Sequence, residues 1–325
     1  MTISAPQQTK SSVQQTKSTT PAEPTATPEQ VVEALHGVFG RHRAARAIHA
    51  KGIVLDGTFT PSPSAAELSQ APHLQQTPVP VVVRFSNFSG APTTGDLEPT
   101  ASPRGMALKF RLPDGSTTDI VAHSFNGFPT SNVDDFRALF IALKASPPGA
   151  PSPSPLETFF ATHPAAKAFL TAENPPPVSY GSLPYYGINS FKFINAQGSV
   201  RFGRYRIDPV DGGRFLSPVE RQTTSDHYLA AATRARVQSG PITFTLSVQL
   251  AGPDDIIDDP SLVWPETRQL VSLGVLSIQR AVDDSEAAER ALWFDPAALP
   301  AGIEVADPMI RARSAAYLVS QQQRR

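Results

Sequence analysis

The stretch "VPVVVRFSN" at residues 79–87 has the composition and alternation of a β-strand. Because successive side chains of a strand face opposite sides, Arg84 and Ser86 share one face. Val83 and Phe85 share the other, which suits a buried interior. An arginine within a mainly apolar strand needs a partner for its charge, unless it lies at a sheet edge and reaches water. The stretch therefore predicts a strand with one apolar face and one face that carries polar groups.

Seven further runs rich in Val, Ile, Phe and Thr predict strands at residues 52–59, 105–112, 117–125, 190–196, 199–207, 242–251 and 271–281. The links at 112–116 and 196–199 have the composition of hairpin turns, so these neighbours should be antiparallel. Eight antiparallel strands are enough to close a barrel with side chains or one ligand inside. We therefore predict an α+β fold, an eight-stranded antiparallel β-barrel with flanking helices.

Helical patterns flank the strands, and we expect these helices to pack on one side of the barrel. The first follows Thr27, which forms a capping-box pattern with Gln30, and it should end near Gly40. The others are expected at residues 133–145, 155–172, 217–238, 284–293 and 306–325. Residues 1–27 are rich in Ser, Thr, Gln and Pro, and we expect a disordered tail there. Residues 28–325 then form a single domain.

The composition of the chain excludes several classes of function. The 325 residues carry a net charge of -1 and include no cysteine, which excludes disulfides, thiolate catalysis and iron–sulfur clusters. The near-neutral charge does not indicate a nucleic-acid partner. No apolar run approaches the ~20 residues of a membrane-spanning helix. The N-terminus lacks the apolar segment of a secretory signal, so we expect a cytoplasmic protein.

Two groups of residues could carry chemistry, although each alone has an ordinary explanation. Arg46 and His49 are three residues apart just before a predicted strand, where a histidine is usually structural. Arg313, Tyr317 and Arg324 share one face of the final helix. That face alone would suit an exposed basic stripe with a tyrosine whose ring packs on the surface. Neither group by itself therefore predicts a function.

Five short motifs follow one another in a fixed order: R-x-x-H-A-K-G (46–52), V-R-F-S (83–86), P-R-G-M-A-L-K-F (103–110), D-I-V (119–121) and R-x-x-x-Y (313–317). The ordered set resembles the haem catalase superfamily, and more closely its small catalase-related peroxidases, over about residues 28–325. The resemblance implies a catalase-like haem-binding domain without the C-terminal extensions of full catalases. Lys51 receives no role from it and is expected to be solvated.

The resemblance also implies catalytic and axial residues. His49 matches the histidine above the haem that acts as general acid and base on peroxide. Ser86 matches the serine that hydrogen-bonds this imidazole and fixes its orientation. Tyr317 matches the axial ligand of ferric protohaem, bound as a phenolate. Arg313, one helical turn earlier, would supply positive charge to the phenolate oxygen.

Four further residues match positions that contact the haem itself. Arg46, Arg84 and Arg324 match the arginines that hold the two haem propionates, where buried charges must be paired. Phe136 falls where the family stacks a phenylalanine on a haem pyrrole. The resemblance therefore predicts that residues from four distant parts of the chain surround one haem.

The chain departs from the family pattern at two positions. Full catalases place an asparagine four residues after the aspartate that corresponds to Asp119 of the D-I-V motif, where it positions a second peroxide. Here that position is His123, and Asn126 lies close by in the sequence. His123 could hydrogen-bond peroxide or water, or it could face solvent at the end of a strand. Phe88 stands where the family has a smaller residue near the access channel, so access should be altered.

The resemblance implies a haem-dependent peroxidase that reduces organic hydroperoxides and, less well, hydrogen peroxide, through a ferryl haem intermediate. Its other partner would be a small-molecule electron donor, and its catalase activity should be weak. A homo-oligomer is left open. Three alternatives also stay open: a true catalase, a hydroperoxide isomerase or dehydratase of the allene oxide synthase type, and a haem-binding barrel without turnover.

Overall fold

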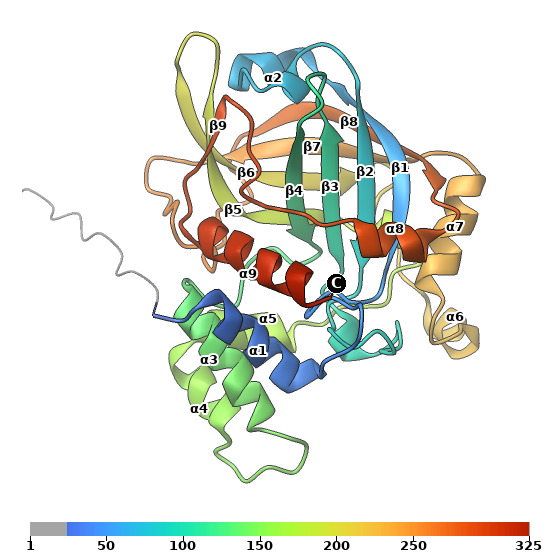
Figure 1. Cartoon of the computed structure of the whole chain (residues 1–325), viewed down its shortest axis with the longest axis vertical. Helices are drawn as coiled ribbons and strands as arrows, with labels where there is room; N and C mark the ends of the chain where they lie inside the picture. Colours follow the sequence, from blue (N-terminus) through green and yellow to red (C-terminus); the bar gives the residue numbers. More distant parts are fainter. Residues whose placement is uncertain (1–24, 325) are drawn as a thin grey trace, which may run out of the picture.

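The computed structural model describes residues 25–324, and its centre is a closed β-barrel (Figure 1). The strands are β1 (Gly52–Pro61), β2 (Val79–Ser86), β3 (Gly105–Arg111), β4 (Thr117–His123), β5 (Tyr185–Ile194), β6 (Val200–Pro209), β7 (Ile242–Leu250), β8 (Leu270–Ala281) and β9 (Ile303–Val305). Their order in the sheet is β4-β3-β2-β1-β8-β7-β6-β5-β9, and β4 also pairs with β5. The predicted eight-stranded antiparallel barrel is therefore confirmed, with β1 to β8 forming the ring.

The ring is completed by one pair of residues, His123 of β4 and Tyr186 of β5. The sequence did not predict β9, which adds three residues to the side of β5. Three residues are too few for an alternating pattern to stand out. β5 also begins earlier than expected, at Tyr185 rather than residue 190. The sequence did not indicate this, because Gly187 and Asn189 interrupt the hydrophobic run.

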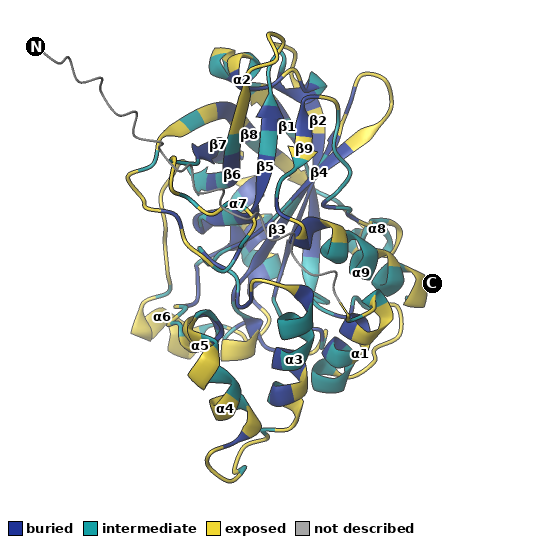
Figure 2. Cartoon of the chain, turned by 90° about the vertical axis from the view of Figure 1, so that its left-hand side faces the viewer, coloured by how far each residue is buried: buried dark blue, intermediate teal, exposed yellow. Residues whose placement is uncertain are grey.

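Side chains fill the interior of the barrel. Phe59, Phe85, Phe110, Tyr185 and Phe244 have essentially no exposed surface and belong to one hydrophobic cluster. Figure 2 shows the strands as mainly buried, whereas α4 (Pro155–Thr162) and α6 (Pro218–Thr223) are mainly exposed. The sequence left open whether side chains or a ligand occupy the barrel interior, and the structure has side chains there. Any ligand site built on these strands must therefore lie on their outer faces.

The helices within the described residues are α1 (Pro28–Phe39), α2 (Pro63–Leu68), α3 (Val133–Lys144), α4 (Pro155–Thr162), α5 (Pro164–Thr171), α6 (Pro218–Thr223), α7 (Leu229–Gln238), α8 (Ser285–Ala291) and α9 (Met309–Gln323). Helices α1, α3, α4, α5 and α9 gather at one end of the barrel, whereas α2 lies at the other end (Figure 1). The expectation that helices pack on one side therefore holds for this group and not for α2.

Two predicted helices are each divided in two. The segment 155–172 forms α4 and α5, because Pro164 lacks the backbone N–H that would continue the first helix. The segment 217–238 forms α6 and α7. Between them, Asp96 accepts a hydrogen bond from the backbone N–H of Leu229 at 2.8 Å, so a distant loop replaces the helical bond there.

The first helix begins as predicted. The Thr27 hydroxyl accepts from the Gln30 backbone, and the Gln30 side chain accepts from the Thr27 backbone, which completes the capping box. Just before it, the backbone N–H groups of Thr25 and Ala26 donate to Asp134 of α3. The expected disordered tail falls mostly on residues 1–24, which lie outside the described residues, and the single-domain assignment stays a prediction.

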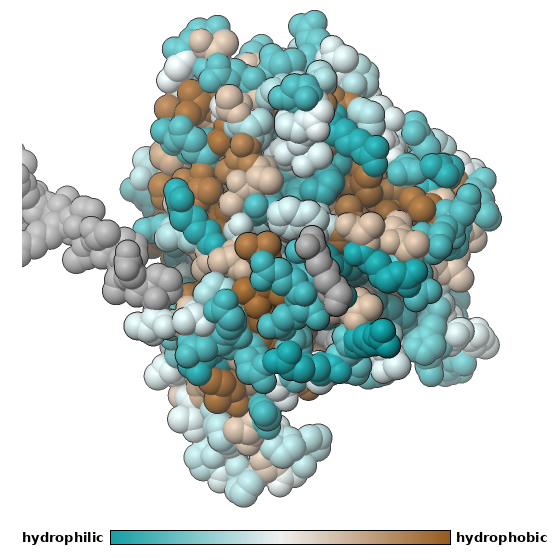
Figure 3. All heavy atoms as spheres, in the orientation of Figure 1, coloured by the Kyte–Doolittle hydropathy of each residue, from teal (hydrophilic) through white to brown (hydrophobic). Residues whose placement is uncertain are grey.

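No helix within residues 25–324 is both long and apolar enough to cross a membrane. On the face shown in Figure 3, hydrophobic residues form scattered groups among hydrophilic ones. The cytoplasmic location stays a prediction.

Candidate active site

One cavity collects every site residue that the sequence predicted. It lies on the outer side of β2–β4, and α1, α3, α9 and the segments at residues 46–49 and 293–294 contribute most of the remaining wall. The predicted residues that line it are Arg46, His49, Arg84, Ser86, His123, Phe136, Arg313, Tyr317 and Arg324. The first and the last of them, Arg46 and Arg324, are 278 positions apart in the sequence. The structure thus brings all nine together, and their chemical roles stay proposals.

The register of the sheet places three of these positions in a row. Ser86 pairs with Gly105, and Gly105 pairs with His123, so the three lie side by side across β2, β3 and β4. The preceding row, which includes Phe85 and Met106, faces the barrel interior. Since neighbouring positions on a strand face opposite sides, a slip of one residue would turn the polar row into the core.

His49 precedes β1 in a left-handed backbone conformation, with φ of +60°. This conformation is unfavourable for a residue other than glycine and persists where surrounding contacts enforce it. Two such contacts are visible: the His49 backbone N–H donates to the Phe88 carbonyl at 2.9 Å, and Arg84 donates to the His49 carbonyl at 2.8 Å. The backbone of His49 is therefore fixed at both its N–H and its carbonyl group, and this fixes where the imidazole begins.

The hydrogen bonds of the His49 ring determine its tautomer. Nδ1 lies 2.9 Å from the Asn87 carbonyl oxygen, which can only accept, and 3.1 Å from the Ser86 hydroxyl. Nδ1 therefore carries the proton, and Nε2 is left with a free lone pair. Burial, together with the positive charge of Arg84, lowers the pKa of His49 to about 3. The ring is neutral at ordinary pH and can serve as a base.

Gly105 provides the space for this arrangement. A methyl group at its Cα would come within 2.6 Å of the Ser86 oxygen and 2.8 Å of His49 Nδ1, closer than real side-chain contacts. Glycine at this point of the row therefore lets the imidazole lie against the sheet.

His123, and not Asn126, faces the same cavity. The Asn126 amide instead donates to Glu266 at 3.0 Å, outside the cavity lining. His123 is buried, which rules out the solvent-facing alternative, and burial lowers its pKa to about 3. The Phe125 backbone N–H donates to its Nδ1 at 3.4 Å, so the proton is on Nε2. That Nε2 has no hydrogen-bond partner among the described residues and offers the cavity a donor.

Arg313 connects Tyr317 to a buried acid that the sequence reasoning missed. Its guanidinium donates to the Tyr317 hydroxyl oxygen at 3.2 Å and also to the Asn189 side-chain oxygen. The Asn189 amide in turn donates to Asp307 at 2.6 Å. Burial raises the pKa of Asp307 to about 6. Asn189 lies just before the predicted strand at 190–196, and Asp307 lies before the residues that form α9, so only their positions in the structure reveal the connection.

The three arginines expected to bind carboxylates converge on α8. Arg46 and Arg84 both contact the Glu289 carboxylate, at 2.6 and 2.8 Å. Arg46 and Arg324 also donate to the Leu292 carbonyl, each at 2.8 Å. Burial, with the nearby charge of Arg84, lowers the pKa of Arg46. The sequence reasoning missed Glu289, because no local pattern relates it to residues more than 200 positions earlier.

Aromatic side chains form part of the apolar wall. Phe136 of α3 lines the cavity, and Phe128, which was not predicted, stacks on it with ring centroids 5.4 Å apart. The guanidinium of Arg313 lies 5.9 Å from the Phe128 ring. An aromatic wall next to cationic groups suits a flat conjugated ligand with acidic groups.

Lys51 is only partly solvated, because its side chain is 20% exposed and its ammonium group is paired, contrary to the expectation from sequence. Its ammonium contacts the buried Asp96 carboxylate at 2.6 Å and the Thr94 carbonyl at 3.2 Å. The Asp96 carboxylate also accepts from Asn87, whose carbonyl orients His49. Lys51 therefore helps to fix the loop beside the imidazole.

The donor set fits haem. An apolar wall with Phe128 and Phe136 suits the porphyrin faces, and an arginine cluster suits its carboxylates. A tyrosine oxygen beside an arginine suits ferric iron. The unpartnered, buried Nε2 of His123 is a polar atom that a bound species in this cavity would satisfy.

Comparisons with known proteins agree with this geometry. The chain is 39% identical over 297 residues to a catalase-related peroxidase of Mycolicibacterium paratuberculosis, covering 90% of this chain and 93% of that one. It is 32% identical over 301 residues to a catalase-related peroxidase of Synechococcus elongatus, covering 91% and 88%. The fold superposes on the crystal structure of a fungal catalase with a TM-score of 0.76 at 20% identity, covering 87% of this chain and 60% of that one.

The fungal structure shows a shared fold, and the two more similar relatives show kinship along nearly the whole chain. The sequence model of the catalase family matches residues 4–325. Catalases carry haem, which the cavity on the outer face of the barrel is suited to bind. The chain therefore belongs to the catalase family.

Proposed function

We propose that this protein is a haem-dependent peroxidase that reduces hydroperoxides with electrons from an external small-molecule donor. The observation that carries the proposal is the neutral His49 imidazole, whose Nδ1 is bound to the Asn87 carbonyl so that its Nε2 lone pair can accept a proton, in the same cavity as Tyr317. The names of the two more similar relatives, both catalase-related peroxidases, support it.

The residues that would hold the cofactor follow from their chemistry. The Tyr317 oxygen would bind ferric iron, and Arg313, 3.2 Å away, would stabilise its negative charge. Arg46, Arg84 and Arg324 would bind the two propionates. When bound, haem supplies the iron-centred redox chemistry that splits the O–O bond.

The part of His49 is to move one proton. Its Nε2 accepts the proton from the peroxide oxygen and returns it to the other oxygen, which leaves as water or alcohol. The depressed pKa keeps Nε2 unprotonated before the peroxide arrives. The balance is one hydroperoxide, two electrons from the donor and two protons, which give one alcohol and one water. Ser86 and the Asn87 carbonyl keep the ring oriented throughout.

His123 supports peroxide reduction more than dismutation. Its Nε2–H can donate to a bound peroxide oxygen. The family's asparagine positions a second peroxide for oxidation, and the nearby Asn126 is turned toward Glu266. Catalase activity is therefore expected to be weak.

The test uses haem-loaded protein and two variants. His49→Ala should keep the haem absorption but lose at least a hundredfold in the rate of peroxide cleavage, since general acid–base catalysis contributes about 10²–10⁴-fold. His42→Ala, at an exposed histidine outside the cavity, is the matched control. Full activity in His49→Ala would remove this residue from its proposed role.

Two further readouts separate the alternatives. Vigorous oxygen release from hydrogen peroxide would indicate a true catalase. Rearranged products formed without oxidation of a donor would indicate an isomerase or dehydratase. Tyr317→Phe should lower the haem content, and an unchanged content and spectrum would contradict phenolate binding.

A further inference from the structure

Trp293 is exposed to solvent and also lines the active-site cavity. Its side chain is 39% exposed. Of the described residues that line the cavity, it alone is exposed, whereas the others are buried or half-buried. The next residue, Phe294, lines the same cavity and is buried. One aromatic ring therefore extends from the cavity that is suited to haem to the surface of the protein.

The backbone on both sides of Trp293 is fixed by hydrogen bonds. Before it, the Leu292 carbonyl accepts from Arg46 and Arg324, each at 2.8 Å. After it, the Asp295 backbone N–H donates to a buried carboxylate of β4 at 2.7 Å. Arg46 and Arg324 are also two of the three arginines proposed to bind the propionates. Trp293 therefore lies at the edge of the cavity where the propionates of a bound haem would lie.

The charges beside the Trp293 ring cancel each other. The Lys109 ammonium lies 6.0 Å from the centroid of the ring. A cation alone at this place would oppose the removal of an electron from the indole, because the ring would become positive. Both oxygens of the buried Asp119 carboxylate accept from this ammonium at 2.7 Å, so the pair carries no net charge at neutral pH. The indole can therefore lose an electron without a strong opposing charge.

An indole ring suits electron transfer to haem. Haem can exchange single electrons with nearby groups. Indole and phenol rings give up one electron far more readily than the benzene ring of phenylalanine, because their heteroatoms stabilise the radical that forms. Among the described residues of the cavity lining, Tyr317 is the one other such ring, and it is assigned to the iron. Trp293 is therefore the ring of the lining that is available to pass electrons.

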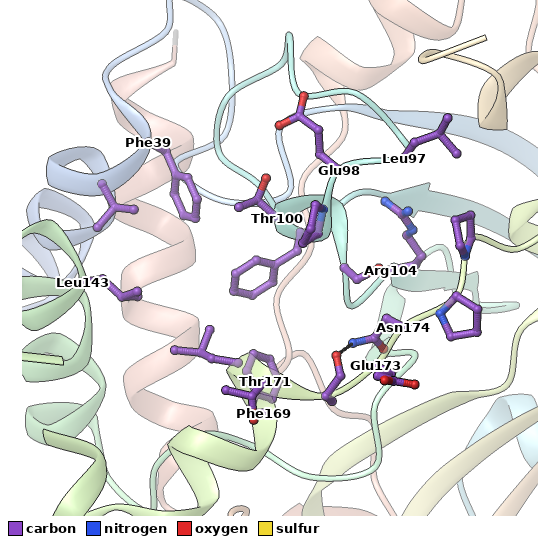
Figure 4. Close-up of a pocket in the computed structure, with 18 of the residues that line it drawn as sticks. Phe39, Leu97, Glu98, Thr100, Arg104, Leu143, Phe169, Thr171, Glu173 and Asn174 are labelled. Atoms are coloured by element: carbon purple, nitrogen blue, oxygen red, sulfur yellow. Dashed lines mark hydrogen bonds between the residues drawn. The ribbon is translucent and has the colours of Figure 1, made fainter. Parts of the chain in front are cut away.

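A larger cavity beside α1, α3, α4 and α5 offers no comparable ring. Its volume is about 1200 Å³, and Figure 4 shows Phe39 and Phe169 in its wall. Its lining, within the described residues, contains phenylalanine but neither tryptophan nor tyrosine. An electron donor held there would meet only rings that are hard to oxidise, so Trp293 is the better point of entry for electrons.

We propose that Trp293 passes electrons, one at a time, from phenolic donors at the protein surface to the haem site. This rests on the proposed peroxidase function, in which cleavage of one hydroperoxide leaves the site two electrons short. The indole gives one electron and becomes a radical cation, and a phenol then restores it by losing one electron and one proton, which yields a phenoxyl radical. Two such rounds supply the two electrons and two protons that convert one hydroperoxide into one alcohol and one water. The donor stays outside the cavity, so its size is not limited by the cavity.

The test compares one donor in two sizes, with cumene hydroperoxide as the oxidant. Free 4-hydroxyphenylacetamide is the small donor, and 4-hydroxyphenylacetyl groups carried on aminodextran are the large one. For Trp293→Phe, with rates expressed per bound haem, the ratio of large-donor to small-donor kcat/KM should fall at least about tenfold. Trp293→Tyr, whose phenol can also lose an electron, should keep most of this ratio. The control Trp264→Phe removes a tryptophan that is 3% exposed and lies outside the cavity lining, and it should leave the ratio unchanged.

A spectroscopic measurement without turnover completes the test. Haem-loaded protein is mixed with an equimolar amount of cumene hydroperoxide, without a donor, and frozen. Its EPR spectrum should show a radical whose hyperfine splitting changes when the protein contains ring-deuterated tryptophan, in wild type and Trp264→Phe but not in Trp293→Phe. A tryptophan radical that persists in Trp293→Phe, an unchanged donor ratio in that variant, or an equal fall of the ratio in Trp293→Tyr would overturn the proposal. Wild-type protein whose haem spectrum does not respond to the hydroperoxide would instead refute the peroxidase function.

Discussion

Replacing Glu289 with alanine removes a carboxylate that two buried arginines share. Arg46 and Arg84 both contact its Oε2 atom, at 2.6 and 2.8 Å, and their side chains are only 15% and 4% exposed. The variant leaves both arginines in place with fewer acceptors. Arg84 keeps the His49 carbonyl, and Arg46 keeps the Leu292 carbonyl. The net charge of the cluster rises by one.

The structure sets the size of the expected effect. Removing one partner of a buried ion pair destabilises a protein by about 3–5 kcal/mol. Because both arginines keep a backbone acceptor, we expect the lower end, about 3 kcal/mol, for the haem-free protein. In the haem-loaded protein the propionates offer new anions, so the loss should be about 1 kcal/mol. The difference of about 2 kcal/mol requires the folded variant to bind haem roughly 30-fold more tightly.

Two measurements check this. Urea unfolding gives the stability of both forms of Glu289→Ala, and titration of the haem-free protein with haem gives the affinity. Glu286→Ala is the matched control on α8, because Glu286 is 86% exposed and pairs with the exposed Arg290 one turn away. That change should alter stability by less than about 0.5 kcal/mol. If Glu289→Ala bound haem more weakly than wild type, Glu289 would be holding the arginines in place for haem, and the competition argued here would be wrong.

Three further predictions concern the histidines. Gly105→Ala should keep haem but lose most peroxide cleavage, because the added methyl group would lie only 2.8 Å from His49 Nδ1 and would displace the ring. Normal activity would show that a side chain at position 105 is tolerated next to His49. The rate of peroxide cleavage should stay level on acidification to about pH 4 and fall only near the His49 pKa of about 3, whereas a fall centred near 6.5 would mean a solvated imidazole. Burial lowers the pKa of His73 to about 4, below its unfolded value of about 6.5, so its share of stability is complete above pH 6.5 and is lost as the pH falls toward 4. The free energy of unfolding of His73→Phe, measured with urea, should therefore fall between pH 7 and pH 4 by about 3 kcal/mol less than that of wild type. An equal fall in both proteins would contradict the effect of burial on His73.

The strands could be predicted because their information is local. A run such as residues 79–87 alternates over a few positions, and this is enough to separate an inner from an outer face. The breaks in the helices were partly readable: Pro164 marks the end of α4 in the sequence itself. The division of α6 from α7 was not readable, because it depends on Asp96 from a distant loop.

The site residues could be predicted only together, because it is their ordered set, and no single residue, that resembles a known family. Residue types and order suggested that Arg46, His49, Ser86 and Tyr317 act together, and the structure places them around one cavity. Partners with no local signal were missed. Glu289, Asn189 and Asp307 look ordinary in sequence, because what distinguishes them is a neighbour far away in the chain.

By itself the sequence predicted the eight strands of the barrel, most of the helical segments, and a set of candidate site residues that match this family. Only the tertiary structure decided that the barrel holds side chains, that the cavity lies outside it, and that His123 rather than Asn126 faces it. The reason is physical. Local periodicity acts over a few residues, whereas the pairing of β2 with β3 and of β3 with β4 sets the register of Ser86, Gly105 and His123. That register aligns the outer face on which His49 rests.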